Sequence, residues 1–367
     1  NGPYSRDDDK HGLGDWDPST KKLPKGLSYI AKEALKRKVG FGIWLEPEMV
    51  NPQSELYQKH PDWIITQSKR EPILGRHQEI LDLTRPEVQA FEWDIIDKTL
   101  RPNPDITYVK WDCNRYITQP GSSYLQPADQ SHLWIDYNRA LYRLMDRFAK
   151  GFPNVMAMLC AGGSGRVDYG AMPYFHSFWP SDNTDPLGRI KIQWGFSHFF
   201  PANTISAHVT RMGKRHLKMA IDVALSGAFG IDLALDKATA EERAQIADAV
   251  KLYKERIRPL VMHGELYRLV SPYESPLASL SYVSTDKQKA VVYFYQTKDG
   301  NEPRVMLGGL DAHKKYRVEE VSLAKGVTSR FPANGKVFTG AELMEKGLEN
   351  PLNTQFESAV LILVANN

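Results

Sequence analysis

The segment YVKWDCNRYI, residues 108–117, carries charged side chains directly behind strand-forming ones. Tyr108 and Val109 suit the interior of a strand, and Lys110 and Asp112 follow at once. A lysine ammonium beside a carboxylate keeps the carboxylate ionised, as a nucleophile must be. The segment alone also fits a structural explanation, in which Asp112 pairs with Lys110 or caps a helix.

Three other segments end an apolar run in polar or aromatic side chains. They are GIWLEPEMV with Trp44, Glu46 and Glu48, MLCAGGSGR with Cys160, Gly162, Gly163 and Arg166, and FWPSDNTDP with Trp179, Asp182 and Asp185. Each has a structural alternative: the glutamates as partners of arginines or backbone groups, the glycines as a turn of close approach, and SDNTD as a turn and helix N-cap. These alternatives explain the segments one at a time, whereas a shared active site explains all four.

The pattern of residues 1–262 indicates the elements that position these side chains. Short apolar runs alternate with helical periodicity, which predicts β/α units around a parallel sheet. The predicted strands are 39–45, 80–83, 107–111, 155–159, 175–179, 204–208 and 228–233. The predicted helices are 27–38, 86–100, 134–150, 189–200, 214–225 and 240–258. These strands are one fewer than the eight of a (β/α)8 TIM-type barrel, which is an α/β fold. Either the pattern misses one strand or the first barrel strand precedes residue 1, and we expect the second.

The pattern changes after Arg258 and Pro259. Short strands separated by turn residues are predicted at 267–269, 280–284, 290–296, 304–307, 316–321, 335–339 and 359–364. They indicate a C-terminal antiparallel β-sandwich domain. We therefore expect a catalytic barrel at 1–262, incomplete at its N-terminus, and an antiparallel β domain at 263–367.

Composition argues against several other classes of protein. The chain has 367 residues and a net charge of +3 with both signs intermixed, which disfavours nucleic acid as a partner. Its apolar runs are shorter than the roughly 18 residues of a membrane span. The two cysteines, Cys113 and Cys160, and the scattered histidines form no metal motif, so we expect neither a metal nor a cofactor. The given sequence starts with neither Met nor a signal peptide, and it does not indicate the cellular compartment of the protein.

The four segments fall where barrel active sites gather, at the carboxyl ends of the strands. Two carboxylates on different strands suit glycoside hydrolysis, in which one attacks the anomeric carbon and the other protonates the leaving oxygen. Lys110 would keep Asp112 ionised for attack, and the aromatic Phe178 and Trp179 would raise the pKa of Asp182, as an acid requires.

Taken together and in this order, the motifs resemble glycoside hydrolase family 36, which consists largely of retaining α-galactosidases. They are FGIWLEPEMVNPQSELYQKHPDWII, GRHQEILDLTRPEV, YVKWDCNR, CAGGSGRVDYGAM and WPSDNTDP followed by RIKIQWG, and they cover nearly all of residues 1–270. The later phrase TGAELMEKGL resembles the family's C-terminal β-domain.

The resemblance implies a retaining exo-α-galactosidase that removes terminal α-linked galactose from oligosaccharides or glycans through a covalent galactosyl-enzyme intermediate. It implies Asp112 as nucleophile and Asp182 as general acid/base, with Asp185 supporting its loop. The implied substrate-binding residues are Trp44, Arg76, Lys110, Asn114, Cys160, Gly162, Gly163 and Trp179, with Asp15 and Trp16 nearby. Within the family the alternative is an α-N-acetylgalactosaminidase, and outside it a catalytically silent carbohydrate-binding protein.

The sequence also departs from the family's pattern. The Asp-Asp-Gly-Trp segment that ends the family's first barrel strand, expected directly before residue 1, is absent, as is the large N-terminal β-domain. His77 stands in GRHQ where Asn is expected, and CAGG replaces CSGG. We therefore expect the N-terminal half of the same enzyme as a partner. Oligomers are frequent in the family, so a homo-oligomer is a further expectation.

Overall fold

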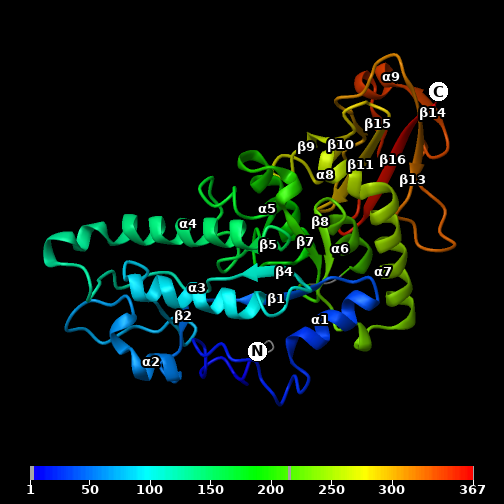
Figure 1. Cartoon of the computed structure of the whole chain (residues 1–367). Helices are drawn as coiled ribbons and strands as arrows, with labels where there is room; N and C mark the ends of the chain where they lie inside the picture. The colour runs from blue at the N-terminus through cyan, green and yellow to red at the C-terminus, as the bar shows by residue number, and fades with distance from the viewer. Residues whose placement is uncertain (1–3, 214–215, 367) are drawn as a thin grey trace. The chain divides into compact units, whose positions relative to one another are not determined.

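A computed structural model describes residues 4–213 and 216–366 of the chain. Contacts between residues group the chain into two compact units, 1–179 and 180–367. The chain follows the predicted alternation of strands and helices in its first two thirds and becomes mostly antiparallel strand after residue 264 (Figure 1).

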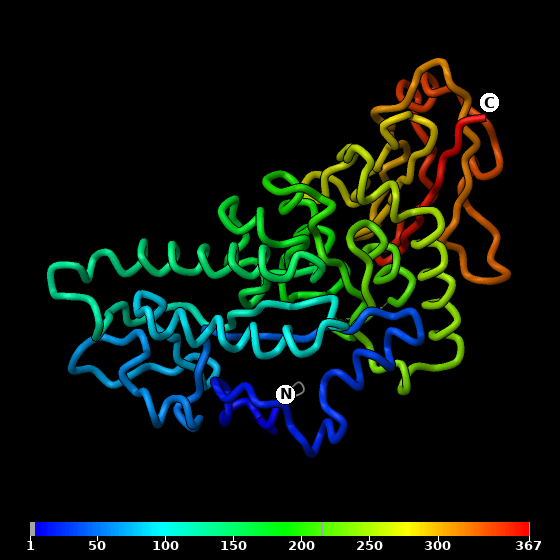
Figure 2. Tube along the Cα trace, viewed as in Figure 1, coloured from blue at the N-terminus to red at the C-terminus, as the bar shows by residue number. Residues whose placement is uncertain are grey.

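The first unit contains a parallel four-stranded sheet in the order β1-β4-β5-β6. The strands are β1 Phe41–Leu45, β4 Ile106–Trp111, β5 Met156–Leu159 and β6 Ser177–Phe178. In the register of β1 and β4, which run side by side in Figure 2, Trp44 lies opposite Lys110. Lys110 in turn lies opposite Met158 of β5. The segments that follow these strands therefore emerge at one edge of the sheet.

Helices of the first unit follow amphipathic patterns. They are α1 Gly26–Lys36, α2 Glu55–Lys59, α3 Pro86–Leu100 and α4 Leu133–Gly151, with 3-10 turns η1 Pro61–Trp63 and η2 Pro127–His132. The helix predicted at 86–100 is confirmed at both ends, and Pro86 occupies its first turn, where a missing N–H costs nothing. The longest helix, α4, buries a stripe of side chains three or four residues apart: Leu133, Tyr137, Ala140, Leu141, Leu144, Met145 and Phe148.

The strand predicted at 80–83 is wrong as a barrel strand. The structure has a two-residue strand there, β3 Glu79–Ile80, which pairs antiparallel with β2 Met49–Val50 outside the parallel sheet. This small antiparallel pair lies in the segment that connects β1 to α3. Its apolar run serves burial, because Ile80 and Leu81 are both nearly inaccessible to solvent.

The second unit begins with the remaining β/α elements. They are α5 Pro186–Phe199, η3 Ala202–Thr204, β7 Ser206–Val209, α6 Leu217–Ala224, β8 Ala228–Ile231, η4 Leu235–Lys237, α7 Ala240–Leu252, η5 Tyr253–Ile257 and α8 Arg258–His263. Strands β7 and β8 pair in parallel. The helix predicted at 240–258 is interrupted, because η5 is a π-helical segment that separates α7 from α8. Part of the helix predicted at 214–225 lies outside the described residues, and α6 accounts for the rest.

An antiparallel sheet of six strands, in the order β14-β13-β16-β11-β10-β9, follows in the second unit. Its strands are β9 Glu265–Val270, β10 Leu277–Val283, β11 Lys289–Gln296, β13 Lys315–Glu320, β14 Val337–Thr339 and β16 Ser358–Asn366. A second sheet pairs β12 Arg304–Val305 with β15 Leu348–Glu349, and α9 Gly340–Glu345 begins at a Thr339–Glu342 capping box.

Three tyrosine hydroxyls attach this sheet to the end of α6. Tyr295, Tyr293 and Tyr282 donate to the backbone carbonyls of Asp222, Leu225 and Ser226 at 3.0, 2.9 and 2.9 Å. These carbonyls lie at the C-terminal end of a helix, where intrahelical partners run out. The tyrosines satisfy them and bury their rings in the same contact.

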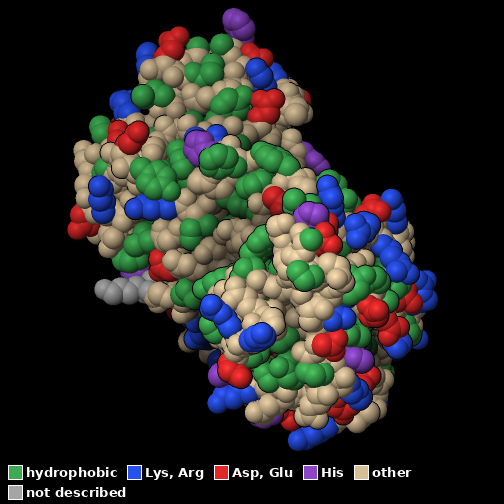
Figure 3. Space-filling view, turned by 90° about the vertical axis from the view of Figure 1, so that its left-hand side faces the viewer, with side chains coloured by type: hydrophobic (Ala, Val, Ile, Leu, Met, Phe, Trp, Pro, Cys, Tyr) green, Lys and Arg blue, Asp and Glu red, His purple; other side chains and the backbone are tan. Residues whose placement is uncertain are grey.

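Basic and acidic side chains are interspersed over the face drawn in Figure 3. This mixing agrees with the small net charge of the sequence. Among the described residues, the helices are all too short or too polar to cross a lipid bilayer.

Candidate functional site

Asp112 is the first residue after β4, and its partners come from β1, from β4 itself and from the residue that follows it. Its backbone N–H continues the sheet by donating to the carbonyl of Leu45 at 2.8 Å. The indole Nε1 of Trp44 donates to its Oδ2 at 3.0 Å, and the backbone N–H of Cys113 donates to its Oδ1 at 2.9 Å. The Nζ of Lys110 lies 3.8 Å from Oδ2. The pairing of Asp112 with Lys110 is therefore present, whereas the structure has no helix at 112–118 for Asp112 to cap.

These partners keep the buried Asp112 ionised. Burial alone would raise the pKa of its carboxyl, but four groups together outweigh burial and lower that pKa below the ordinary value. They are hydrogen bonds from the side chains of Trp44, Asn114 and Cys160, and the charge of Lys110. A carboxylate that is ionised and directed at the end of a sheet has the properties of a nucleophile.

Aromatic rings surround this carboxylate. The ammonium of Lys110 lies 5.5 Å from the ring centroid of Trp179, which is buried behind β6. Trp44 packs against Trp16, with ring centroids 5.9 Å apart. The structure thus brings Trp44 and Lys110 to Asp112, and Trp179 to Lys110.

Glu46, which follows β1, holds the loop behind Asp112. Its Oε1 accepts two hydrogen bonds from Asn114, one from the backbone N–H and one from the side-chain amide, both at 2.7 Å. Burial, followed by the charge of Asp112, raises the pKa of Glu46 to about 7. The sequence offered Glu46 either as a residue of the shared active site or as a partner of an arginine or of backbone groups. It did not single out Asn114, because a contact across 68 residues leaves no local signal.

The segment behind β5 brings a thiol and two glycines to the same edge. Cys160 is buried, its side chain hydrogen-bonds Asp112, and burial raises the pKa of its thiol to about 12. Gly162 and Gly163 adopt φ of 56° and 100°, which side chains tolerate poorly. The carbonyl of Gly163 accepts from the N–H of Ala161 at 2.9 Å, so the glycines form the tight turn proposed as their structural alternative.

Arg76 and His77 lie in a tight turn between β2 and β3. Both are exposed and both adopt the left-handed conformation, with φ of 51° and 61°. The charge of Arg76 acts on Glu46 and lowers its pKa. The carbonyl of His77 accepts from Asn51 at 2.6 Å, so the backbone of His77 has a structural role.

Glu48 is a structural residue. It is fully buried, and its carboxylate accepts from Arg166 Nη1 at 2.6 and 2.8 Å, from Trp111 Nε1 at 3.1 Å and from the Tyr137 hydroxyl at 2.6 Å. The alternative in which a glutamate of this motif pairs with an arginine is therefore confirmed for Glu48. The network joins β4, α4 and the glycine turn into one support beneath Asp112.

Glu48→Ala is expected to lower the free energy of unfolding by about 3 kcal/mol or more, because it leaves the Arg166 guanidinium without its carboxylate. The shift of the urea-unfolding midpoint at constant slope measures this loss. Glu55→Ala is the matched control, since its pair with Lys59 is exposed on both sides and should contribute less than about 1 kcal/mol. Equal, small losses in the two variants would contradict the structural role of Glu48.

Asp182 belongs to the second unit, where it lies exposed in the loop before α5. The N-cap of α5 is not Asp182 but Asp185, whose Oδ2 accepts from the N–H of Gly188 at 3.0 Å. Asn183 completes the turn by accepting from the N–H of Asp185 at 3.0 Å. The negative charge of Asp182 acts on the buried Arg189, whose pKa burial lowers to about 10. The turn and cap functions of SDNTD are thus carried by its other residues.

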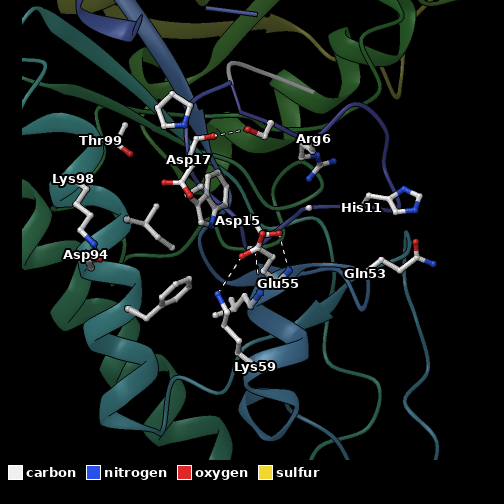
Figure 4. A pocket seen from close by; sticks show the side chains of 18 of the residues that line it. Arg6, His11, Asp15, Asp17, Gln53, Glu55, Lys59, Asp94, Lys98 and Thr99 are labelled. Carbon is white, nitrogen blue, oxygen red and sulfur yellow. Dashed lines mark hydrogen bonds and ion pairs between the residues drawn. The ribbon is translucent and has the colours of Figure 1, made fainter. Parts of the chain in front are cut away.

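A cavity of about 880 Å³ lies elsewhere in the first unit (Figure 4). The N-terminal loop, α2 and α3 line it, with Asp15, Glu55, Lys59, Asp94 and Lys98 among the labelled side chains. Asp15, which the resemblance placed near the sugar, accepts from the backbone N–H groups of Glu55 and Leu56 at 2.9 and 3.1 Å and so caps α2. The strand-end residues around Asp112 do not line this cavity. Trp16 lines it and packs against Trp44, so it is the link between the cavity and the strand ends.

Metal ligation has no candidate in the part of the chain that the structure describes, because no three His, Cys, Asp or Glu residues gather there in a suitable cluster. The groups at the strand ends that can do chemistry include the carboxylates, the ammonium of Lys110 and the indoles. Such a set suits proton transfer and nucleophilic attack by a carboxylate.

Comparison with known proteins places this chain in a family. The sequence profile of the family described as melibiase matches residues 2–264, and that of the glycosyl hydrolase family 36 C-terminal domain matches residues 277–363. The α-galactosidase AgaA of Geobacillus stearothermophilus is 39% identical over 355 residues, which are 94% of this chain and 46% of that protein.

Solved structures agree with the sequence comparison. The crystal structure of the GH36 α-galactosidase AgaB from Geobacillus stearothermophilus matches with a TM-score of 0.90 at 39% identity, over 98% of this chain and 49% of that one. An AgaA variant in complex with raffinose matches with a TM-score of 0.90 at 38% identity and the same coverages, 98% and 49%. The predicted fold class, a (β/α)8 TIM-type barrel followed by an antiparallel β domain, is thereby confirmed. The chain belongs to glycosyl hydrolase family 36, and it spans about half the length of the relatives it matches.

Proposed function

We propose that the protein containing this chain is a retaining exo-α-galactosidase that hydrolyses terminal α-linked galactose from oligosaccharides or glycans. The observation that carries the proposal is the carboxylate of Asp112, which is buried behind β4 and kept ionised by the groups around it. The names of the relatives support the choice of sugar, because AgaA is an α-galactosidase and one of its variants was crystallised with raffinose.

The proposed reaction has two steps. In the first, an Asp112 carboxylate oxygen attacks the anomeric carbon of galactose, and the bond to the leaving oxygen breaks while Asp182 donates a proton to that oxygen. In the second, Asp182 takes a proton from water, the water oxygen attacks the same carbon, and the bond to Asp112 breaks. The configuration at the anomeric carbon is inverted twice and therefore retained.

The remaining residues would bind the sugar. Trp44 and Trp179 offer apolar faces for a sugar ring, and Lys110 and Arg76 offer donors for hydroxyl groups. Asn114, Cys160, Gly162 and Gly163 would shape the pocket around the anomeric carbon. We assign these residues to a barrel at 1–262, with residues 263–367 as a separate C-terminal domain, and we expect the rest of the full-length enzyme to complete the sugar site.

The full-length natural protein is expected to release aryl alcohol from an aryl α-galactoside with a kcat/KM at least about 100-fold above that for the matching α-N-acetylgalactosaminide. The reason is that an acetamido group does not fit a pocket shaped for the 2-hydroxyl of galactose. A colorimetric assay of the two substrates under identical conditions measures the ratio of their kcat/KM values. Preference for the acetamido sugar would instead indicate an α-N-acetylgalactosaminidase. Binding of galactose without turnover of either substrate would indicate a carbohydrate-binding protein.

A further inference from the structure

Glu46 occupies an unusual position for an acidic side chain. It follows β1 directly, and only 1% of its surface is exposed. Its Oε1 accepts both hydrogen bonds from Asn114 at 2.7 Å, and its Oε2 accepts from Nε2 of Gln78 at 3.4 Å. A carboxylate at the end of one strand thus holds the loop that leaves the neighbouring strand.

The residue held by Glu46 is itself a partner of Asp112. The side-chain amide of Asn114 donates to Glu46, and its interaction with Asp112 lowers the pKa of the Asp112 carboxyl. An amide nitrogen carries two hydrogens, so Asn114 has one for each carboxylate. Its backbone N–H, also bound to Glu46, fixes the chain two residues beyond Asp112. Removal of Glu46 would free both ends of this link.

We propose that Glu46 is a positioning residue for Asp112: acting through Asn114, it fixes the direction of the carboxylate that attacks the sugar. The inference rests on the proposed function, because it gives Glu46 a part in the same reaction. Glu46 does not touch the reacting atoms in this arrangement, and its effect passes through the Asn114 link.

The charge of Glu46 changes in the neutral range. Burial, followed by the charge of Asp112, raises its pKa to about 7, while the hydrogen bonds from Asn114 and the charge of Arg76 act in the opposite direction. Asp112 and Arg76 are the charged groups that act on it, the thiol of Cys113 is a further titratable group beside it, and Gln78 and Asn114 are its neutral partners. Asp112 has a lowered pKa and stays ionised throughout this range.

The sign of the pH effect follows from these charges. Below pH 7 Glu46 is neutral and accepts ordinary hydrogen bonds from Asn114. Above pH 7 it is ionised, and charge-assisted hydrogen bonds are about twice as strong. The second negative charge also favours the positive charge that develops on the sugar ring in the transition state. The nucleophilic step should therefore become faster as the pH rises through about 7.

The test uses the full-length natural protein and an activated aryl α-galactoside, whose leaving group needs little help from an acid. Glu46→Ala is expected to lower kcat/KM by roughly 10- to 100-fold, as misplacement of a reacting group does, and to change the inhibition constant of galactose less than about twofold. Glu46→Gln keeps an acceptor for Asn114, so it should lose less than about 10-fold and should lack the rise of kcat/KM near pH 7.

Glu79→Gln is the matched control. Glu79 is equally buried, and burial also raises its pKa to about 7, but it contacts the loop after Asp112 at Arg115, at 3.2 Å, and not at Asn114. The pH rise should persist in this variant. Thermal unfolding of all three variants separates a loss of folded protein from a loss of rate.

The outcomes distinguish the inference from the proposed function. An active natural protein whose Glu46→Ala variant keeps kcat/KM within about twofold would overturn the inference alone. Loss of the pH rise in Glu79→Gln but not in Glu46→Gln would overturn it as well. A natural protein that turns over neither aryl substrate would overturn the proposed function, and the positioning role with it.

Discussion

Asp112→Asn is expected to lower the turnover of aryl α-galactosides by on the order of 10³-fold or more, with little effect on the binding of galactose. Asparagine has the size of aspartate and keeps an oxygen that can accept from Trp44 or from the N–H of Cys113. It lacks the charge and the nucleophilic oxygen, so no covalent intermediate can form. The measurement is kcat with an aryl α-galactoside, paired with the dissociation constant of galactose from calorimetry.

Asp136→Asn is the matched control for this experiment. Asp136 lies in the first turn of α4 with 40% of its side chain exposed, and its contact with Arg139 is a surface pair at 4.0 Å. The same chemical change there should leave turnover unaltered. Normal turnover in Asp112→Asn would eliminate Asp112 as the nucleophile and would direct attention to Glu46, another carboxylate on this edge of the sheet.

The sequence predicted the elements whose signals are local. The helix at 86–100 has the observed bounds because Pro86 marks its first turn and its apolar periodicity runs unbroken to Leu100. The strand that precedes Asp112 was predicted at 107–111 and is Ile106–Trp111. Polar residues at the ends of such strands were enough to predict that Trp44, Lys110 and Asp112 lie together.

Errors arose where local signals are ambiguous. The run at 80–83 is apolar because it is buried, and burial alone does not distinguish a barrel strand from the short antiparallel ribbon of β2 and β3. The π-helical segment Tyr253–Ile257 follows a continuous helical pattern, since one altered turn hardly disturbs the periodicity of the side chains. The partners of Glu46 and Glu48 could not be predicted because they lie 68 and 118 residues away along the chain.

The clearest gain from the structure concerns the two motifs with several acidic residues. In EPE, both glutamates support Asp112, but Glu48 does so through a buried ion pair with Arg166 and Glu46 through Asn114. In SDNTD, Asp185 caps α5, so the cap no longer explains Asp182. Sequence reasoning could not divide these roles, because adjacent carboxylates look alike until their partners are known.

Asp182→Ala is the second decisive substitution, because a general acid has an effect that depends on the substrate. With a raffinose-type substrate the leaving group is the sugar attached to galactose, which departs poorly without a proton, so kcat/KM should fall by roughly 10²- to 10⁴-fold. A dinitrophenyl α-galactoside has a good leaving group and should lose less than about 10-fold. The quantity kcat/KM reports steps only up to the first irreversible one, so the later role of Asp182 as a base does not obscure the comparison.

Asp185→Ala, which removes the cap of the same loop at a cost of about 1 kcal/mol, is the control and should affect both substrates equally. Equal losses on both substrates in Asp182→Ala would reduce Asp182 to a residue that shapes its loop, and the proton donor would then have to come from elsewhere in the full-length protein.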